Sequence, residues 1–324
     1  MAGFFDLALA NLGSPLILSF ILGVAAALAR SELSIPEATA KAMSIYLLFA
    51  IGFKGGVSVA DHGFDPALAK TLFAGIVLSA GLPFVAYALL NVLTGLDRTN
   101  AAAVAGHYGS ISIVTFVAGT SVAEANGFIA EGFMVAVAAA MEAPAILSAL
   151  WLIGRSGSNR MDGTLWREIL LNGSIVLLVG AFMIGLLTGK DGLAEIEAFI
   201  VTPFKGVLCI FLLDMGLVAG RGIRENRDMI RPGLFAFGIL MPVIGSCFGA
   251  AAAALIGLSV GGTLLLMVLS ASASYIAVPA AMRVAVPEAD PGIYLTLSLG
   301  ITFPFNLTIG LPLYLGVARM ISGV

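Results

Sequence analysis

The chain has 324 residues, of which 60% are hydrophobic and only 11% are charged. Its mean hydropathy is +1.06, a value that excludes a soluble globular protein of this size. The net charge is −3, and no stretch combines basic with interleaved aromatic residues, so we expect no nucleic-acid partner. The chain lacks a Ser/His/Asp set, an HExxH motif and paired catalytic aspartates, which argues against an enzyme.

Apolar segments of about 17 to 25 residues follow one another along the chain, and each is long enough to cross the hydrocarbon of a bilayer as an α-helix. The start, MAGFFDLALANLG, has no basic region and no small-residue cleavage pattern, so we expect the first segment to stay in the membrane. We predict an all-α integral membrane protein with ten transmembrane helices. The predicted segments are residues 15–30, 40–57, 70–94, 100–122, 130–153, 168–188, 203–220, 232–257, 262–284 and 293–319.

The second half of the sequence resembles the first. A constant offset of 164 positions pairs charged and small residues across a hundred residues of the chain. Because each half holds five segments, an odd number, the second half enters the membrane from the opposite side. We therefore predict two inverted five-helix repeats, residues 1–162 and 163–324, an architecture typical of secondary transporters. The matched pairs are Lys41/Lys205, Gly52/Gly216, Gly56/Gly220, Glu124/Glu288 and Glu142/Asn306.

The distribution of positive charge predicts the orientation. With the N-terminus outside, eleven of the sixteen Lys and Arg residues fall on one side of the membrane. The positive-inside rule then places both termini outside the cell. The five residues on the outer side are Lys54, Lys70, Lys190, Lys205 and Arg319.

Two predicted helices, the fourth and the ninth, contain clusters of small hydroxyl residues at matching places. Residues 106–115 read GHYGSISIVT, and residues 270–279 read SASASYIAVP. Gly109 tolerates unusual backbone angles and Pro279 cannot donate a backbone hydrogen bond, so we expect both helices to be broken there. Broken helix ends expose N–H groups that favour an anion and C=O groups that suit Na⁺ or H⁺.

We therefore predict that the two clusters meet near the middle of the bilayer and form a substrate site. Taken singly, each hydroxyl could instead bond to its own helix or join two helices, and the histidine and tyrosine could be packed residues with one hydrogen bond. The candidate substrate-binding residues are His107, Gly109, Ser110, Ser112, Thr115, Ser272, Ser274 and Tyr275.

Ionisable and amide residues inside apolar segments are candidate cation ligands or proton carriers, because they are costly there without a partner. Glu142 precedes Pro144 in MEAPAI, and Asn306 follows Pro304 in FPFNLTIG. Thr302 lies one turn before Asn306, where it could add an oxygen. The fourth candidate, Asp214, lies in the apolar run FLLDMGLVAG, although it could instead lie near the end of its helix.

Four arginines crowd one loop on the predicted cytoplasmic side. Contact with lipid phosphates is the usual role of such a cluster, and docking of a soluble regulator is the alternative. The four are Arg221, Arg224, Arg227 and Arg231.

At these motifs the sequence resembles the SbtA-type sodium-dependent bicarbonate transporter family first known from cyanobacteria. The resemblance covers nearly the whole chain, through SIPEATAKAM, IGFKGG, HYGSISIVT, MEAPAIL and the block from residue 279 to residue 318. It implies ten helices in two inverted repeats, a mobile core beside a gate or scaffold, a homo-trimer in the bacterial inner membrane, and Na⁺-coupled uptake of bicarbonate. It also implies binding roles for residues 109–115, 272–279 and 142–144.

Two departures from the family pattern affect what the resemblance implies. Cyanobacterial members carry Ser-Ser-Ser-Asp where this chain has Ser272, Ala273, Ser274 and Tyr275, so an acid and a hydroxyl are missing. The connection between the two halves, which is long in the family, is reduced here to residues around RSGSNRMDGTLWRE. A PII-like regulator docks on the cytoplasmic side of those relatives, and the same kind of partner is one possibility for this chain.

The sequence leads to one main functional hypothesis and keeps two others open. The main hypothesis is a Na⁺ symporter for bicarbonate or a similar small anion that works by alternating access. A second is a Na⁺- or H⁺-coupled carrier of another small anion. A third is an anion channel, whose flux would not depend on a cation gradient.

Overall fold

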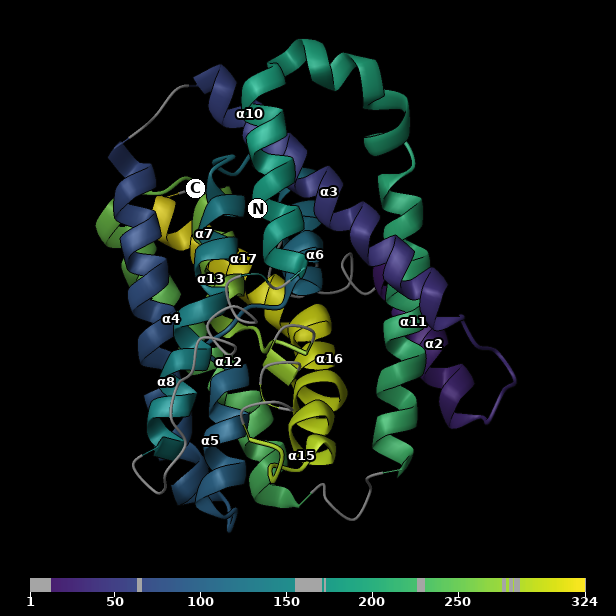
Figure 1. Ribbon diagram of the computed structural model, residues 1–324, viewed down its shortest axis with the longest axis vertical. Coiled ribbons are helices and arrows are strands. Elements are labelled where there is room, and N and C mark those ends of the chain that lie inside the picture. Colours follow the sequence, from purple (N-terminus) through teal and green to yellow (C-terminus); the bar gives the residue numbers. More distant parts are fainter. Residues whose placement is uncertain are drawn as a thin grey trace.

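A computed structural model describes residues 13–62, 66–154, 171, 173–225, 231–275, 278–279, 282 and 286–323, and no strand occurs among them. The connection at residues 155–168 lies outside the described residues. So do five of the arginines assigned to the predicted cytoplasmic side: Arg155, Arg160, Arg167, Arg227 and Arg283. Helices run roughly along the long axis of the molecule (Figure 1). They are α2 (Pro15–Leu28), α3 (Glu37–His62), α4 (Pro66–Leu93), α5 (Arg98–His107), α6 (Ile113–Ala125), α7 (Met134–Ala140), α8 (Glu142–Gly154), α10 (Gly173–Ile200), α11 (Phe204–Glu225), α12 (Pro232–Ile256), α13 (Val260–Ala271), α15 (Pro291–Leu295), α16 (Phe303–Phe305), α17 (Leu311–Ser322) and the π-helices η2 (Thr296–Thr302) and η3 (Asn306–Gly310).

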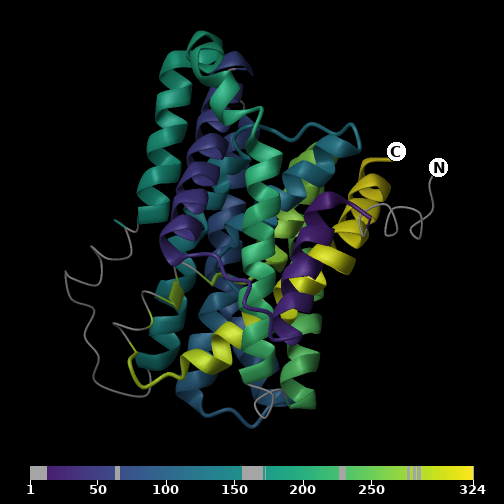
Figure 2. The ribbon, with the colours of Figure 1, turned by 90° about the vertical axis from the view of Figure 1, so that its right-hand side faces the viewer.

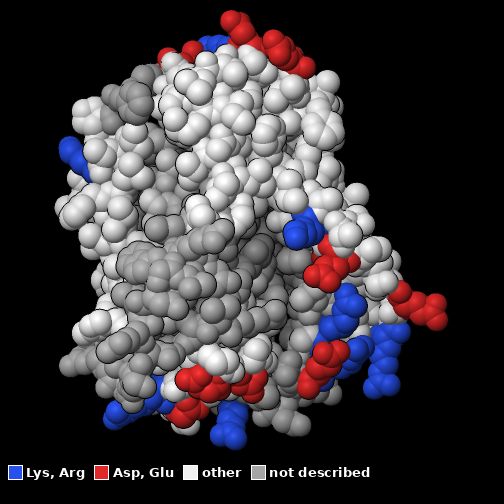
Figure 3. Space-filling view, viewed as in Figure 1, with Lys and Arg blue, Asp and Glu red and all other residues white. Residues whose placement is uncertain are grey.

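Seven helical segments of the described chain are long and apolar enough to cross a membrane. They are α3, α4, the α7–α8 pair, α10, α11, α12 and the segment Pro291–Ser322; α2, α6 and α13 are apolar but shorter. Large apolar side chains face outward, including Phe73 at 70%, Val92 at 81% and Leu255 at 89% exposure. On the face shown in Figure 3, the charged residues among those described gather toward the two ends and the lower right, and the described surface of the upper half is largely uncharged. An all-helical membrane protein accounts for this distribution.

Several predicted segments are interrupted rather than continuous. Segment 100–122 forms α5 and α6, and segment 130–153 forms α7 and α8. Segment 262–284 begins as α13, which ends at Ala271. The segment predicted to end at residue 188 continues as α10 to Ile200, but Gly189, with φ 59°, separates its two helical parts. The last span contains π-helical turns, which occur frequently at functional sites.

Two helix crossings depend on glycine. α3 packs along α10, and α2 packs along α11 (Figure 2). A Cβ atom at Gly56 would lie 1.9 Å from the carbonyl oxygen of Phe182 on α10. A Cβ atom at Gly216 would lie 2.2 Å from the carbonyl oxygen of Phe20 on α2. Only glycine allows these backbones to approach so closely, as in other small-residue crossings of membrane helices.

The start of α5 is held by Asp97. Its carboxylate accepts hydrogen bonds from the Asn100 backbone N–H at 3.0 Å and from the Asn100 side-chain amide at 2.6 Å. The Asn100 side-chain oxygen accepts from the Asp290 N–H at 2.8 Å, which ties the start of α5 to the start of α15. The hydrogen bonds from Asn100 hold the pKa of the Asp97 carboxyl below its usual range.

The α2–α11 crossing predicts a position-specific effect of alanine on α11. Gly216→Ala would force the two backbones apart, so we expect it to lower the free energy of unfolding by about 1–3 kcal/mol. Gly206→Ala on the same helix is the matched control, because no atom lies within 4 Å of its added Cβ. Thermal unfolding of the detergent-solubilised protein measures both. Equal unfolding midpoints for the two variants would contradict the close crossing.

The Asp97 cap predicts an acid-dependent loss of stability. Because the pKa is lower in the folded chain, the ionised cap stabilises the fold at neutral pH, and this contribution disappears as the pH falls below about 4 and through the folded pKa. Asp97→Ala should cost about 1 kcal/mol at neutral pH. Asp97→Asn should keep the cap and lose the acid dependence. Thermal midpoints measured against pH test this, and the same acid profile for wild type and Asp97→Asn would refute it.

Candidate functional site

The first helix break separates α5 from α6. α5 ends at His107, and residues 108–112 lead to α6, whose N-cap is Ser112. Gly109 packs directly on Pro83 of α4: an added Cβ would lie 2.4 Å from Pro83 Cγ and 2.7 Å from the Ser79 carbonyl oxygen. Pro83 has no N–H, so it removes the ordinary intrahelical donor for that carbonyl, four residues earlier. The Ser79 carbonyl oxygen, which has lost its helical donor, therefore faces the break between α5 and α6.

The second break follows α13. That helix ends at Ala271, 164 residues after His107, and residues 272–275 are not helical. The Asn306 side-chain N–H donates to the carbonyl oxygen of Ala271 at 2.9 Å, and the Tyr314 hydroxyl donates to the Asn306 side-chain oxygen at 2.8 Å. Asn306 thus satisfies a carbonyl that the end of a helix leaves without a partner.

The two breaks are in direct contact. The Ser112 N–H donates to Ser272 Oγ at 2.9 Å, and Ser272 Oγ donates to the Leu269 carbonyl at 3.0 Å. The Ser274 N–H donates to the His107 carbonyl oxygen at 2.8 Å. All four polar side chains are buried. Segments far apart in the sequence therefore share one buried polar cluster, as the two hydroxyl-rich stretches predict.

Some hydroxyls of the cluster also serve their own helix. Ser112 Oγ accepts from the Thr115 N–H at 3.2 Å and from Thr115 Oγ1 at 2.9 Å, which caps α6. The Val278 N–H lies 3.5 Å from Ser274 Oγ. The helix-capping role and a binding role coexist at these residues, because each hydroxyl oxygen has two lone pairs.

Glu142 begins α8 beside the first break. It is only 7% exposed, and its Oε2 accepts a hydrogen bond from Ser110 Oγ at 2.7 Å. No Lys or Arg pairs with it in the part of the chain that the structure describes. Ser79 of α4 secures this turn, since its hydroxyl accepts from the Ala145 N–H at 3.2 Å and donates to the Met141 carbonyl. The Glu142 carboxylate and the Ser110 hydroxyl are hard oxygen groups of the kind that a small cation requires.

Thr302 and Asn306 lie at the junction where the two helix breaks meet, but neither forms a hydrogen bond with Glu142. Thr302 Oγ1 lies 2.6 Å from the Tyr108 hydroxyl and donates to the Gly238 carbonyl at 2.7 Å. That carbonyl is four residues before Pro242, the proline inside α12, and so lacks its helical donor. Thr302 therefore joins the first break to α12, and Asn306 joins the second break to the last span.

Asp214 is not hydrogen-bonded to the other candidates among the described residues. It is buried on α11, and no hydrogen bond joins it to the serine clusters among the described residues. The charged group that acts on it is Arg221, two turns later on the same helix. The four sequence candidates for cation ligands are thus not joined by hydrogen bonds into one cluster among the described residues.

Three buried polar atoms near the breaks have no hydrogen-bond partner among the described residues: Ser270 Oγ, His107 Nε2 and the Tyr275 hydroxyl. His107 Nδ1 lies 2.7 Å from the Ala103 carbonyl, and the ring stacks on Tyr294 with centroids 4.4 Å apart. Since a carbonyl only accepts, Nδ1 carries the proton and Nε2 of the neutral ring is an acceptor. The Tyr275 hydroxyl is near Ser112 without meeting hydrogen-bond geometry.

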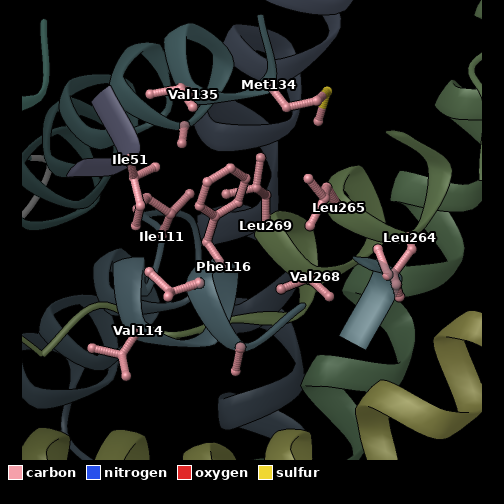
Figure 4. Packing of buried hydrophobic residues seen from close by; sticks show 14 of the residues in the cluster. Ile51, Ile111, Val114, Phe116, Met134, Val135, Leu264, Leu265, Val268 and Leu269 are labelled. Carbon is pink, nitrogen blue, oxygen red and sulfur yellow. The ribbon is translucent and has the colours of Figure 1, made fainter. Parts of the chain in front are cut away.

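A cluster of buried apolar residues lies beside the polar cluster. Figure 4 shows Phe116 surrounded by Ile51, Ile111, Leu265 and Leu269, from α3, the first break and α13. A pocket of about 350 Å³ lies between α3 and the α6–α7 region and is lined in part by Phe116, Ile51 and Leu265. Lys54 of α3 and Glu124 of α6 form an ion pair across this pocket at 3.7 Å.

Sequence reasoning missed Ser79 and the Gly238 carbonyl. The available signal was the position of each, four residues before a proline inside an apolar segment.

No curated protein matches the chain. A family model described as the Na⁺-dependent bicarbonate transporter superfamily matches residues 15–319. The match covers both helix breaks, Glu142 and all the helices that surround them. The chain therefore belongs to the Na⁺-dependent bicarbonate transporter superfamily.

Proposed function

We propose that the protein is a secondary active transporter that carries bicarbonate or a similar small anion together with Na⁺ by alternating access. The observation that carries this proposal is Glu142, a buried acid at a helix break with a hydroxyl donor and no basic partner among the described residues. A carboxylate in that position needs a cation or a proton. Na⁺ bound there would neutralise it and make the adjacent cluster favourable for an anion.

The anion would bind at the start of α6, beside Ser112 and Ser272. The N-terminus of a helix carries a partial positive charge and unpaired N–H groups, and hydroxyls can donate to an anion. The C-terminal ends of α5 and α13 carry partial negative charge instead, which suits Na⁺. Opposite helix ends within one junction would thus bind opposite charges side by side. Na⁺ and bicarbonate are both cargo of this site.

We further propose the ten-helix architecture of two inverted repeats, residues 1–162 and 163–324. The ends of α5 and α13, 164 residues apart, support it. The helix crossings also support it, because exchanging equivalent helices turns the α3–α10 pair into the α11–α2 pair. The gate would comprise α2, α3, α10 and α11, and the mobile core the remaining helices.

Motion of the core against the gate, by an elevator or a rocking movement, would open the site to alternate sides. The Lys54–Glu124 pair joins the two groups at the pocket beside Phe116, which would be one access route. We place the protein in the bacterial inner membrane with both termini outside, as the Lys and Arg distribution favours. A homo-trimer and a PII-like cytoplasmic regulator are further proposals, which rest on family resemblance.

A proton is the alternative coupling ion, and the same observation favours it, because Glu142 could be neutralised by protonation as well as by Na⁺. A carrier of another small anion would follow the same scheme. An anion channel would require no neutralisation step at Glu142 and would conduct without a cation gradient.

Glu142→Gln should reduce the rate of Na⁺-dependent uptake by at least about tenfold, because the neutral amide cannot compensate the charge of the cation. The assay is radiolabelled bicarbonate uptake into proteoliposomes with an inward Na⁺ gradient or with choline. Glu195→Gln, an exposed acid on α10, is the matched control and should transport like wild type.

Three outcomes separate the hypotheses. Wild-type uptake driven by a proton gradient and indifferent to Na⁺ would assign H⁺ coupling. Uptake equal in Na⁺ and choline without any cation gradient would indicate a channel. Undiminished Na⁺-dependent uptake by Glu142→Gln would remove this residue from the site.

A further inference from the structure

A polar pocket lies far along the chain from both helix breaks, where the end of α2 meets the end of α11. Its volume is about 510 Å³, and three arginines line it: Arg30, Arg221 and Arg224. Leu33 and Leu217 give it an apolar wall. We call it the arginine pocket. By the Lys and Arg distribution it opens on the side that faces the cytoplasm.

The backbone at Arg30 adopts a conformation that usually requires glycine. Its φ is 59°, and it is the only described residue other than glycine with a positive φ. The Arg30 N–H bonds to the Ala27 carbonyl at 3.2 Å and the Ser31 N–H to the Ala26 carbonyl at 2.9 Å. This is the helix-ending motif whose left-handed position is ordinarily glycine. A strained residue with a charged side chain at a pocket is an observation that points to function.

The other two arginines are oriented by backbone carbonyls. Arg224 Nη1 donates to the Ala27 carbonyl at 2.9 Å, and Arg221 Nε donates to the Leu217 carbonyl at 3.2 Å. Each guanidinium has five N–H donors, so these bonds leave most of them available. The side chain of Arg30 makes no hydrogen bond or ion pair within the described part of the chain.

The acidic groups near the pocket neutralise the positive charge of its arginines only in part. Glu225 Oε1 lies 3.6 Å from Arg224 Nη2, and Asp214 acts on Arg221 from two turns away. Asp214 is not among the residues that line the pocket. Among the described residues that line the pocket, three are arginines and none is acidic, so this lining carries an excess of positive charge.

We propose that the arginine pocket binds a phosphate group, carried by a phospholipid headgroup or by a soluble phosphate ester. Guanidinium groups match phosphate oxygens with paired N–H donors, and several arginines around one cavity bind phosphate more tightly than exposed lysines. The apolar wall accommodates the glycerol or carbon skeleton of such a ligand. Because the pocket is built from α2 and α11, its occupation would fasten these two helices together. The site is separate from the transport site and does not depend on the proposed coupling mechanism.

The test compares ligands on the full-length protein. Thermal unfolding is measured in neutral detergent with inorganic phosphate or with sodium chloride at equal ionic strength. It is measured separately in nanodiscs of phosphatidylcholine, with or without phosphatidylglycerol. We expect phosphate or phosphatidylglycerol to raise the unfolding temperature of wild type above its chloride or phosphatidylcholine control, by mass action. A response to phosphate alone assigns a soluble ester, and a response to phosphatidylglycerol alone assigns a lipid headgroup.

Arg30→Gly removes the guanidinium and relieves the strained backbone, so the variant should fold with unchanged or higher stability without ligand. Its affinity for the phosphate-bearing ligand should fall about tenfold or more. Arg224→Gln should show the same loss, and Arg98→Gln, an exposed arginine at the start of α5, should respond like wild type. The proposal is overturned when neither ligand stabilises wild type beyond its control, or when Arg30→Gly retains the full response.

Discussion

A carboxylate buried in an apolar span without a basic partner is the constraint around which the helix breaks are organised. An uncompensated charge at this depth is too costly to persist, so Glu142 must share its site with a cation or carry a proton. Its hydrogen bond to Ser110 connects that requirement to the first break, and the Ser112–Ser272 bond connects the first break to the second. A change at the acid is therefore felt by the serines that face the proposed anion.

Prolines and glycines make this arrangement possible in a medium without water. Broken helices inside a bilayer are tolerated only where other groups satisfy the released backbone. Pro242 releases the Gly238 carbonyl, and Thr302 donates to it. In α4, Pro83 releases the Ser79 carbonyl against Gly109, where a side chain would not fit. The Ser79 carbonyl thus faces the first break, whereas the Gly238 carbonyl already has a partner in Thr302, which also lies 2.6 Å from the Tyr108 hydroxyl of that break.

Length and hydropathy were enough to predict an all-helical membrane protein, and the hydroxyl-rich stretches located both breaks because glycine and serine interrupt helices locally. The partners across the fold were not predictable in the same way. Ser79 resembles any serine of a membrane helix, and only packing of α4 against α8 brings it to the Met141–Glu142 turn. Asp214 is also an acid in an apolar run, yet on α11 it forms no hydrogen bond with the serine clusters among the described residues. The repeat, the substrate and the coupling ion stay predictions.

Reciprocal binding is the most direct test of the central claim that one junction holds a cation and an anion together. The dissociation constant for bicarbonate is measured on purified protein across a series of Na⁺ concentrations, and the constant for Na⁺ across a series of bicarbonate concentrations, by calorimetry. Linkage requires both affinities to rise by the same factor, and neutralisation of a shared site predicts a factor of about 5–150. Bicarbonate binding that is indifferent to Na⁺ would contradict the account.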